Sequence, residues 1–444
     1  MPPKGKLSRL IKLTGMTTSV ASRYLGHRVR GAFGGGETDP KRLAATHARV
    51  GARIARTLGE LKGPVMKLGQ MASISTDLLP REIAEPLASL RRDAPPVEFD
   101  VIAGQIESEL GAPPERLFAS FERAPYAAAS IGQVHRAVTD DGRQVVVKVQ
   151  YPGVDASVRS DLSHVRFAFK ASGLIGRKPA AFDRFFEEMR ARLEEEIDYT
   201  HEAENVRLLG GYHERHDWVR VPRVVGERSA QRVLTLTFED GDPIERAVEY
   251  EQPARDRIGE RLLRLVYSQI FERGALHADP NPANFGFRPD GTFALYDYGS
   301  VKRFTDAERD GLADVVRGAL HEDWDAVERG MVAIGARRTD GPPLDPEVYA
   351  FWRGLMAPLF DPVEPFDFGA STLHRRMVSA LPRFREHAGA FQLPIGLMLV
   401  QRTNVGHYGN LRNLRARFRP RDVIEDVLGG GGDDAFAPAA RAAV

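Results

Sequence analysis

Amphipathic helices dominate the pattern of apolar positions in the first 115 residues. Apolar side chains recur there every three or four positions, which predicts one buried helical face. These residues are Val50, Ile54, Leu58, Leu61, Val65 and Leu68. Gly63-Pro64 is expected to end one helix and start the next, because proline is tolerated in a first helical turn. Ala103–Leu110 predicts a further helix, which Gly111 ends.

Beyond residue 118 the pattern changes to short segments of β-branched residues. Ile131–Val138 and Gln144–Val149 predict two strands, and Asp140-Asp141-Gly142-Arg143 between them is a turn sequence. The second strand carries Lys148 near its end. A long helix, rich in carboxylates, is predicted over Asp183–Leu209.

Two more strands are expected over Val219–Val225 and Arg232–Phe238, and Glu239-Asp240-Gly241-Asp242 ends the second. The resulting order is a hairpin, a lysine strand, an acidic helix and two strands. This order is typical of the small lobe of protein kinases.

The remaining sequence predicts a mainly helical lobe. An apolar stripe from Ile258 to Phe271 marks a helix that enters the segment His277–Asn284. Phe285–Arg288 and Thr292–Tyr296 are expected to form a short hairpin. Further helices are predicted at 306–320, 324–334 and 346–359, and the tail 426–444 is expected to be disordered.

The composition narrows the functional classes. The net charge of +1 on 444 residues argues against electrostatic binding of nucleic acid. The absence of cysteine excludes disulfides, thiolate zinc sites and a cysteine nucleophile. The longest apolar run, Phe391–Val400, is about half the length of a bilayer-spanning helix. With no signal peptide evident, the sequence predicts a cytoplasmic protein without a transmembrane helix.

Residues 1–36 carry the strongest charge asymmetry of the chain. Leu7, Leu10, Ile11 and Leu13 lie among basic residues, and the segment has no acidic residue. Such an arm suits peripheral docking on an anionic membrane surface at the inner face. A solvated terminus explains the same composition, so both interpretations stay open.

The segment His277-Ala278-Asp279-Pro280-Asn281-Pro282-Ala283-Asn284 gives the strongest indication of chemistry. Asp279 and Asn284 are five positions apart, and Asp297-Tyr298-Gly299 follows. Protein kinases use this spacing between a catalytic aspartate and a metal-binding asparagine, and place a second metal-binding aspartate in an Asp-aromatic-Gly triplet. Either fragment alone is explained as a turn, since turns are rich in Asp, Asn and Pro. Together they predict a phosphoryl-transfer site.

The chemistry of phosphoryl transfer suggests a role for each side chain. Mg²⁺ prefers oxygen ligands, so Asn284 and Asp297 are the predicted metal ligands. Asp279 is predicted to orient or deprotonate the acceptor. His277 is expected to orient the loop without an acid–base role. His213 and His216 lack a convergent ligand set and are expected on a solvated face.

Lys148 is predicted to contact nucleotide phosphates and to act in catalysis if a helix glutamate fixes its orientation. Spacing leaves its partner open among Glu194, Glu195, Glu196, Asp198, Glu202 and Glu204. Upstream, Ala127, Ala128, Ala129 and Ser130 stand where kinases have a glycine-rich loop. Alanine is stiffer than glycine, so these residues predict a nucleotide loop of altered geometry.

Four motifs in this order resemble those of the AarF/UbiB family of atypical kinase-like proteins, over about residues 40–425. They are Lys67-Leu68-Gly69-Gln70 (K-x-G-Q), Ala127–Gln133, Glu196-Ile197-Asp198 (E-x-D), and His277–Asn284 with Asp297-Tyr298-Gly299. The resemblance implies that Glu202 pairs with Lys148, and that Glu196 and Asp198 face Lys67 and Gln70 as a regulatory latch. It also implies that the N-terminal extension lies across the kinase cleft, which disfavours a peptide acceptor.

The predicted architecture is an α+β, two-lobed protein-kinase-like fold with an N-terminal helical K-x-G-Q extension. Its parts are the basic arm 1–40, the extension 41–115, the N-lobe 116–240, the C-lobe 241–425 and the tail 426–444.

The resemblance implies a protein that binds ATP or ADP with Mg²⁺. It is expected to hydrolyse ATP or to transfer phosphate to a small-molecule or lipid-like acceptor, such as a quinone precursor, in isoprenoid quinone or lipid metabolism. The sequence leaves the oligomeric state open.

Two other functions stay open. A small-molecule kinase of the aminoglycoside or choline type shares the H-x-D-x-x-x-x-N loop but lacks the K-x-G-Q extension, so residues 60–75 argue against it. A non-catalytic, nucleotide-dependent regulator or scaffold of quinone or lipid enzymes would need nucleotide binding without turnover. The intact Asp279, Asn284 and Asp297 argue against this second alternative.

Overall fold

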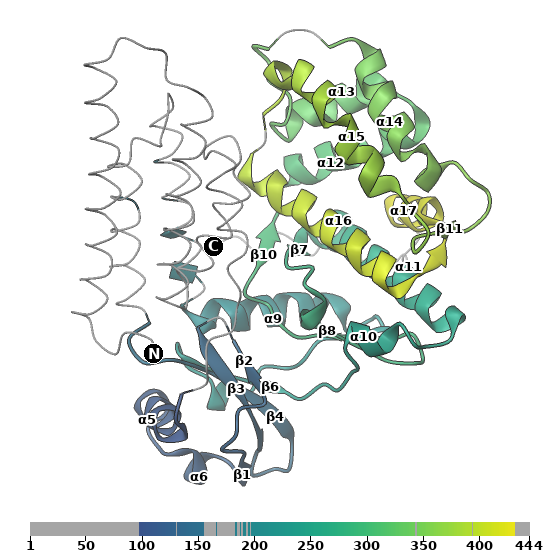
Figure 1. The fold of residues 1–444 in the computed structure, drawn as a ribbon. Helices are drawn as coiled ribbons and strands as arrows, with labels where there is room; N and C mark the ends of the chain where they lie inside the picture. The colour runs from purple at the N-terminus through teal and green to yellow at the C-terminus, as the bar shows by residue number, and fades with distance from the viewer. Residues whose placement is uncertain are drawn as a thin grey trace, which may run out of the picture. The chain divides into compact units, whose positions relative to one another are not determined.

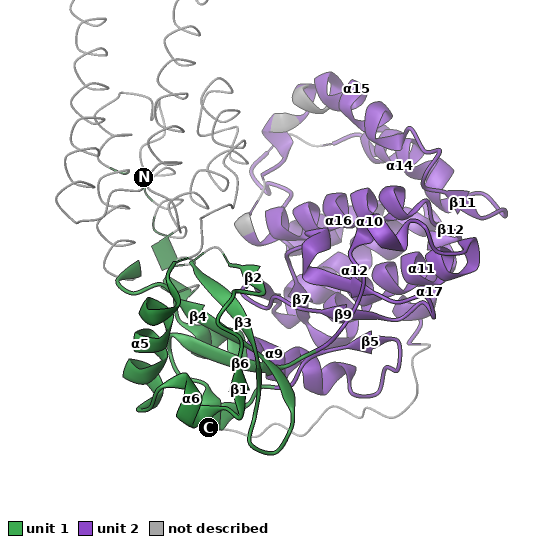
Figure 2. Ribbon diagram, turned by 60° about the horizontal axis from the view of Figure 1, so that its bottom comes forward, with its two compact units in different colours: residues 1–203, 224–238 green, residues 204–223, 239–444 purple. Residues whose placement is uncertain are grey.

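The computed structural model describes residues 97–129, 131–154, 197–341, 344–392 and 394–430 (Figure 1). Between 155 and 196 it describes single residues only, at 166, 183, 187, 190, 191, 194 and 195. The predicted arm 1–40, most of the predicted extension and residues 431–444 lie outside this part. The chain divides into unit 1, residues 1–203 and 224–238, and unit 2, residues 204–223 and 239–444 (Figure 2).

Unit 1 is built on an antiparallel sheet with strand order β1-β3-β4-β6, and β2 also pairs with β3. The strands are β1 (Ser120–Phe121), β2 (Ala127–Ala128), β3 (Gly132–Val138), β4 (Gln144–Gln150) and β6 (Val233–Thr237). The predicted hairpin is therefore present as β3 and β4. Lys148 on β4 pairs with Val134 on β3 and Leu234 on β6, so it lies on a central strand.

Helix α5 (Phe99–Leu110) packs against this sheet, followed by the short helix α6 (Pro114–Leu117). Side chains alternate along a strand, so Val145, Val147 and Val149 share one face of β4. All three are buried in one cluster with Ile102 and Ile106 of α5. Helix α5 starts four residues before the predicted position and ends, as predicted, at Gly111, which has φ +79°.

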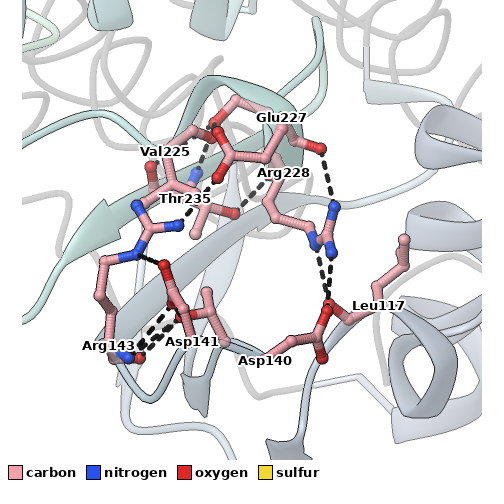
Figure 3. Close-up of polar contacts among 10 residues, drawn as sticks. Leu117, Asp140, Asp141, Arg143, Val225, Glu227, Arg228 and Thr235 are labelled. Atoms are coloured by element: carbon pink, nitrogen blue, oxygen red, sulfur yellow. Dashed lines mark hydrogen bonds and ion pairs between the residues drawn. The ribbon is translucent and has the colours of Figure 1, made fainter.

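Charged side chains connect the β3–β4 turn to the 3₁₀ turn η1 (Gly226–Arg228) (Figure 3). Arg143 forms ion pairs with Asp141 at 2.7 Å and Glu227 at 2.9 Å, and Arg228 pairs with Asp140 at 3.1 Å. Each carboxylate is well exposed, so each pair adds little stability alone. Together they fix the turn conformation at this end of the sheet.

The long helix predicted over 183–209 is interrupted. Ile197 and Asp198 are not helical, and α9 begins at Tyr199 and ends at His213. Asp198 causes the new start, because its Oδ1 accepts the backbone N–H of Thr200 at 2.9 Å. An aspartate in this position is an N-cap, which favours a helix start over a helix interior.

The strand expected over Val219–Val225 is shorter than predicted and is part of a sheet in unit 2, not of the sheet in unit 1. Only β5 (Val219–Arg220) forms, and it pairs in parallel with β9 (Phe293–Leu295) of unit 2. Residues 204–223, which the sequence analysis assigned to the N-lobe, fall in unit 2. The hydrophobic pattern predicted a strand here but could not identify its partner.

Unit 2 is mainly helical, with short strands around the predicted site. Its strands are β5, β7 (Ala275–His277), β8 (Phe285–Phe287), β9, β10 (Val301–Arg303), β11 (Phe366–Asp367) and β12 (Arg417–Phe418). Strand β7 pairs with β10, and β8 pairs with β9 as the predicted hairpin. The α-helices of the unit after α9 are α10 (Ile244–Ala247), α11 (Gln252–Ser268), α12 (Asp306–His321), α13 (Trp324–Ala333), α14 (Pro346–Phe360), α15 (Leu373–Glu386), α16 (Ile395–Leu414) and α17 (Pro420–Leu428).

The interior of unit 2 brings α11 and α16 together. Val266 of α11, Leu276 of β7 and Val400 of α16 are buried in one cluster with Ile270. Ile270 belongs to the π-helical turn η2 (Gln269–Arg273), which continues α11. Helix α17 includes residues 426–428 of the predicted tail. Among the described residues, no helix is long and apolar enough to span a membrane.

Gly132→Ala is expected to destabilise the protein by about 2 kcal/mol, because overpacking of a tight contact costs about that amount. A Cβ at Gly132 would lie 2.0 Å from the carbonyl oxygen of Val149 on β4. Gly104→Ala is the control, since a Cβ in this part of α5 meets nothing within 4 Å and should raise helix stability. Urea unfolding compares the two variants, and equal stability would contradict the packing assignment.

Candidate functional site

Lys148 and Glu202 form a close ion pair within unit 1. The Lys148 ammonium lies 2.8 Å from Oε1 and 2.7 Å from Oε2 of Glu202. The two side chains are only 15% and 6% exposed, and the ammonium also lies 5.0 Å from the ring centre of Tyr199. The structure therefore contains the pair that the family resemblance implied. Screening by water is weak at this burial, so the contact fixes the lysine orientation.

The alanine-rich segment is separated from the lysine strand β4 by one strand, β3. Ala127 and Ala128 form β2 and pair with Val134 and Gln133 of β3. Ala129 donates its N–H to the carbonyl of Gly132 at 3.0 Å, which closes a tight turn. Ser130 lies outside the described residues. Its predicted nucleotide contact, like those of the three alanines, remains a prediction.

Asp198 of the E-x-D motif makes its described contacts locally. Its Oδ1 accepts hydrogen bonds from Thr200, and its Oδ2 accepts one from Gln231 at 3.2 Å. Burial raises the pKa of Asp198, but the hydrogen bonds from Thr200 and Gln231 outweigh burial and lower the pKa overall. Asp198 therefore caps the helix that carries Glu202. The predicted latch partners Lys67, Gln70 and Glu196 lie outside the described residues, so the latch remains a prediction.

In unit 2, prolines and asparagines shape the loop that carries Asp279. Asn281 caps the 3₁₀ turn η3 (Pro282–Asn284), because its Oδ1 accepts the N–H of Ala283 at 3.1 Å. Asn284 donates its Nδ2 to the carbonyl of Asp279 at 3.4 Å. Since the nitrogen is directed to the loop backbone, the carboxamide oxygen is the atom suited to bind a cation.

His277 links this loop to the segment that carries Asp297. The Nε2 of His277 hydrogen-bonds the carbonyl of Asp297, and a carbonyl can only accept, so the proton is on Nε2. Burial lowers the pKa of His277, although the contact with Asp297 raises it in part. A buried, neutral histidine that donates to backbone fits the predicted orienting role. Asp297 Oδ1 in turn accepts the N–H of Gly299 at 2.9 Å.

Backbone hydrogen bonds join the same two segments at further points. Ala278 donates to Ser300 at 2.8 Å, and Tyr296 donates to Asn284 at 2.9 Å. Val301 of β10 pairs with His277 of β7. These contacts hold the loop of Asp279 and Asn284 alongside the Asp297 segment. The two sequence motifs, the loop of Asp279 and Asn284 and the segment of Asp297, therefore lie side by side in unit 2.

Gln269 is a residue of the site that the sequence analysis missed. Its Oε1 accepts the backbone N–H of His277 at 2.8 Å, so its amide nitrogen must donate to His213 Nε2 at 2.9 Å. The proton of His213 is then on Nδ1, which lies 3.0 Å from Nδ1 of His216. A glutamine at the end of an amphipathic helix gives no local sign of this role, because its partners lie on other elements.

The expectation that His213 and His216 lie on a solvated face was wrong for His213, which is 2% exposed. Burial lowers the pKa of His213 well below its usual value, with smaller effects from His216 and Arg215. Burial, followed by Arg215 and Arg264, lowers the pKa of His216 to about 4. The described residues hold no cluster of three or more His, Cys, Asp and Glu side chains suited to a metal.

Asn205 was also missed by the sequence analysis. Its Nδ2 donates to the carbonyl of Tyr298 at 3.0 Å, and its Oδ1 accepts from Arg303 at 3.1 Å. The ring of Tyr298 is buried, and its hydroxyl donates to the carbonyl of Leu295 at 2.9 Å. Hydrogen bonds at the carbonyl and at the hydroxyl of Tyr298 thus hold the Asp-Tyr-Gly segment in place.

Glu202→Gln is expected to lower the free energy of unfolding by about 3 kcal/mol, because it removes the carboxylate from a buried ion pair. Glu214→Gln, just after the end of α9 at an exposed position, is the charge-matched control and should change stability by less than about 0.5 kcal/mol. Denaturant unfolding measures both variants. Equal stabilities would show that the ion pair does not stabilise unit 1.

Stability is expected to fall as the pH is lowered from about 6.5 towards 4. The unfolded histidines take up protons near pH 6.5, whereas His216 stays neutral in the folded protein down to about pH 4. Below pH 6.5 the unfolded state therefore binds more protons than the folded state, so the free energy of unfolding decreases as the pH is lowered. His216→Gln should show a smaller decrease than the wild type in urea unfolding at pH 7, 6 and 5. His321→Gln, at an exposed position of α12, is the control, and a wild-type slope in His216→Gln would contradict the assignment.

The chain matches the sequence model of the ABC1 atypical kinase-like domain over residues 89–331. It is 32% identical to Protein ACTIVITY OF BC1 COMPLEX KINASE 7, chloroplastic, of Arabidopsis thaliana over 340 residues, which cover 76% of this chain and 48% of that protein. It is 27% identical to Atypical kinase COQ8B, mitochondrial, of Danio rerio over 439 residues, which cover 96% of this chain and 69% of that protein. The chain thus spans only about half the length of the plant relative.

A solved structure is similar over most of its length. It is described as the complex structure of Rv3197-erythromycin from Mycobacterium tuberculosis, with 29% identity and a TM-score of 0.60, covering 83% of this chain and 93% of that chain. The predicted kinase-like fold of mixed helix and sheet is confirmed. The domain match and these relatives also confirm the resemblance found from the motifs: the chain belongs to the AarF/UbiB family of proteins with an ABC1 atypical kinase-like domain.

Proposed function

We propose that this protein is an atypical kinase or ATPase. It binds ATP with Mg²⁺ and either hydrolyses the nucleotide or transfers its terminal phosphoryl group to a non-protein acceptor. We further propose that this activity supports isoprenoid quinone or lipid metabolism. The membership in an atypical kinase-like family supports the first part.

The observation that carries the proposal is the joining of the two acidic segments in unit 2. Bonds from His277 to Asp297, from Ala278 to Ser300 and from Tyr296 to Asn284 hold these segments together. Asp279, Asn284 and Asp297 thus come from one hydrogen-bonded substructure, as a phosphoryl-transfer site requires.

The residues present fit a magnesium ion. Asn284 offers a carboxamide oxygen and Asp297 a carboxylate, which are the hard oxygen ligands that Mg²⁺ prefers. Two protein ligands are few, and this suits a cation whose other ligands are phosphate oxygens and water. When bound, Mg²⁺ would neutralise charge on the phosphates. Asp279 would orient the attacking hydroxyl or water and accept its proton.

Lys148 is the phosphate-binding lysine in this proposal. Glu202 holds the Lys148 ammonium with two contacts of 2.7 and 2.8 Å, which would fix its orientation toward the α- and β-phosphates. Ala127 and Ala128, two exposed residues of β2, would cover the nucleotide. Ala129 and Ser130 would complete that cover.

The acceptor is proposed to be a small molecule or a lipid. The Mycobacterium tuberculosis relative is described in complex with erythromycin, which is a non-protein molecule. This description supports testing small molecules and lipids before peptides. A basic arm over residues 1–36 would favour an acceptor at an anionic membrane surface.

Asp297→Asn is expected to reduce Mg²⁺-dependent nucleotide turnover at least ~100-fold, because it removes the charged metal ligand. Asp279→Asn is expected to cause a similar loss while nucleotide affinity stays near the wild-type value. Asp290→Asn is the matched control, since Asp290 lies in the exposed turn between β8 and β9 and accepts from Thr292 at 2.8 Å. Release of phosphate measures turnover, and isothermal titration measures affinity.

Wild-type turnover in the Asp297→Asn variant would contradict the metal assignment. Wild-type turnover in Asp279→Asn would remove Asp279 from catalysis. If Asp279→Asn restores a deletion strain but Lys148→Met does not, nucleotide binding without turnover is the function, and the protein is a regulator.

A further inference from the structure

Helix α16 contacts the loop on both sides of Asp279, although more than a hundred residues separate them in the chain. Arg402 donates to the carbonyl of Ala278, which directly precedes Asp279. Asn410 donates its Nδ2 to the carbonyl of Pro280 at 2.8 Å, which directly follows Asp279. Two side chains of one helix therefore hold the two peptide groups that flank the proposed catalytic aspartate.

Gly406 lies between these two contacts and allows the close approach. A Cβ at this position would lie 2.2 Å from Cγ and 2.7 Å from Cβ of Pro280. Real side chains do not approach that closely, so a residue larger than glycine would displace the proline or the helix. Residues 402, 406 and 410 are four positions apart, which places them on the same face of α16.

The environment makes these contacts costly to lose. Asn410 is 3% exposed, and Ala278 and Pro280 are buried. A buried backbone carbonyl that loses its donor costs about 1–3 kcal/mol. Within this loop, Pro280 and Pro282 have no N–H, so the loop cannot form a regular ladder of its own. The geometry around Asp279 thus depends on donors from another element.

We propose that Arg402, Gly406 and Asn410 form a positioning face for Asp279. The face sets the backbone conformation at residues 278–280 and thereby the position of the Asp279 carboxylate relative to the acceptor. None of the three residues is assigned to the reacting groups, so their effect is indirect. All three lie beyond the part of the chain that the family model matches, residues 89–331. The catalytic part of this inference rests on the proposed function.

The test compares two matched pairs of variants on α16 in the full-length protein. Gly406→Ala introduces the clash with Pro280, whereas Gly409→Ala adds the same methyl group where nothing lies within 4 Å. Asn410→Leu removes the donor to Pro280. Thr403→Val removes a buried hydroxyl that donates only to Leu399, within the same helix, at 2.8 Å.

Gly406→Ala and Asn410→Leu are expected to lower kcat ~100-fold, the cost of misplacing a catalytic group by about 1 Å. The dissociation constant for Mg-ATP should stay within about threefold of the wild-type value, since the nucleotide ligands are unchanged. Gly409→Ala and Thr403→Val should keep wild-type kcat, even where Thr403→Val lowers the unfolding temperature as much as Asn410→Leu does. If Thr403→Val lowers kcat as much as Asn410→Leu does, general destabilisation explains both losses, and the proposal is overturned.

Hydrogen–deuterium exchange separates this inference from the proposed function. Amides of residues 278–285 should exchange faster in Gly406→Ala and Asn410→Leu than in their two controls. If the wild type shows no nucleotide turnover, the proposed function fails, yet exchange still tests whether α16 holds the loop. Unchanged exchange in both variants would overturn the positioning face whatever the activity.

Discussion

The structure around the proposed site depends on one constraint: buried, irregular backbone must find hydrogen-bond partners outside itself. The segments that carry Asp279 and Asp297 are neither helix nor long strand, so their carbonyl and N–H groups lack regular partners. Side chains from several elements of unit 2 supply them, namely Asn205, Gln269, His277, Arg402 and Asn410. The positions of the two carboxylates follow from these contacts.

A second constraint operates in unit 1, where a charge is placed on the central strand of a sheet. Burial of the Lys148 ammonium is tolerated because Glu202 offers both carboxylate oxygens. The glutamate is positioned by α9, and α9 begins where Asp198 caps it. Asp198 thus affects the orientation of Lys148 indirectly, because it caps the helix that carries Glu202.

Much of the fold could be predicted from local pattern. The apolar periodicity over 306–320, 324–334 and 346–359 became α12, α13 and α14 with boundaries that differ by one residue at most. The β3–β4 hairpin and the pairing of Glu202 with Lys148 were also expected, the first from β-branched segments joined by a turn sequence and the second from the family resemblance. Spacing alone left six carboxylates as candidate partners, because a helix and a strand can meet in many registers.

What could not be predicted depends on contacts between distant parts of the chain. Nothing near His213 in the sequence indicates that Gln269 will bury it, and nothing near Gly406 indicates that Pro280 will pack on it. The start of α9 at Tyr199 was missed for a different reason. An aspartate inside an acidic helical pattern can be a surface residue or a cap, and the choice depends on which backbone N–H groups are left without partners.

Every role proposed for the site residues requires that this protein binds a nucleotide together with magnesium. Isothermal titration of the folded, full-length protein with ATP, in the presence and absence of Mg²⁺, tests it most directly. We expect saturable binding near one nucleotide per chain, and this binding should weaken strongly when the metal is removed. No binding heat with ATP or ADP at several temperatures, from protein that unfolds cooperatively, would contradict it.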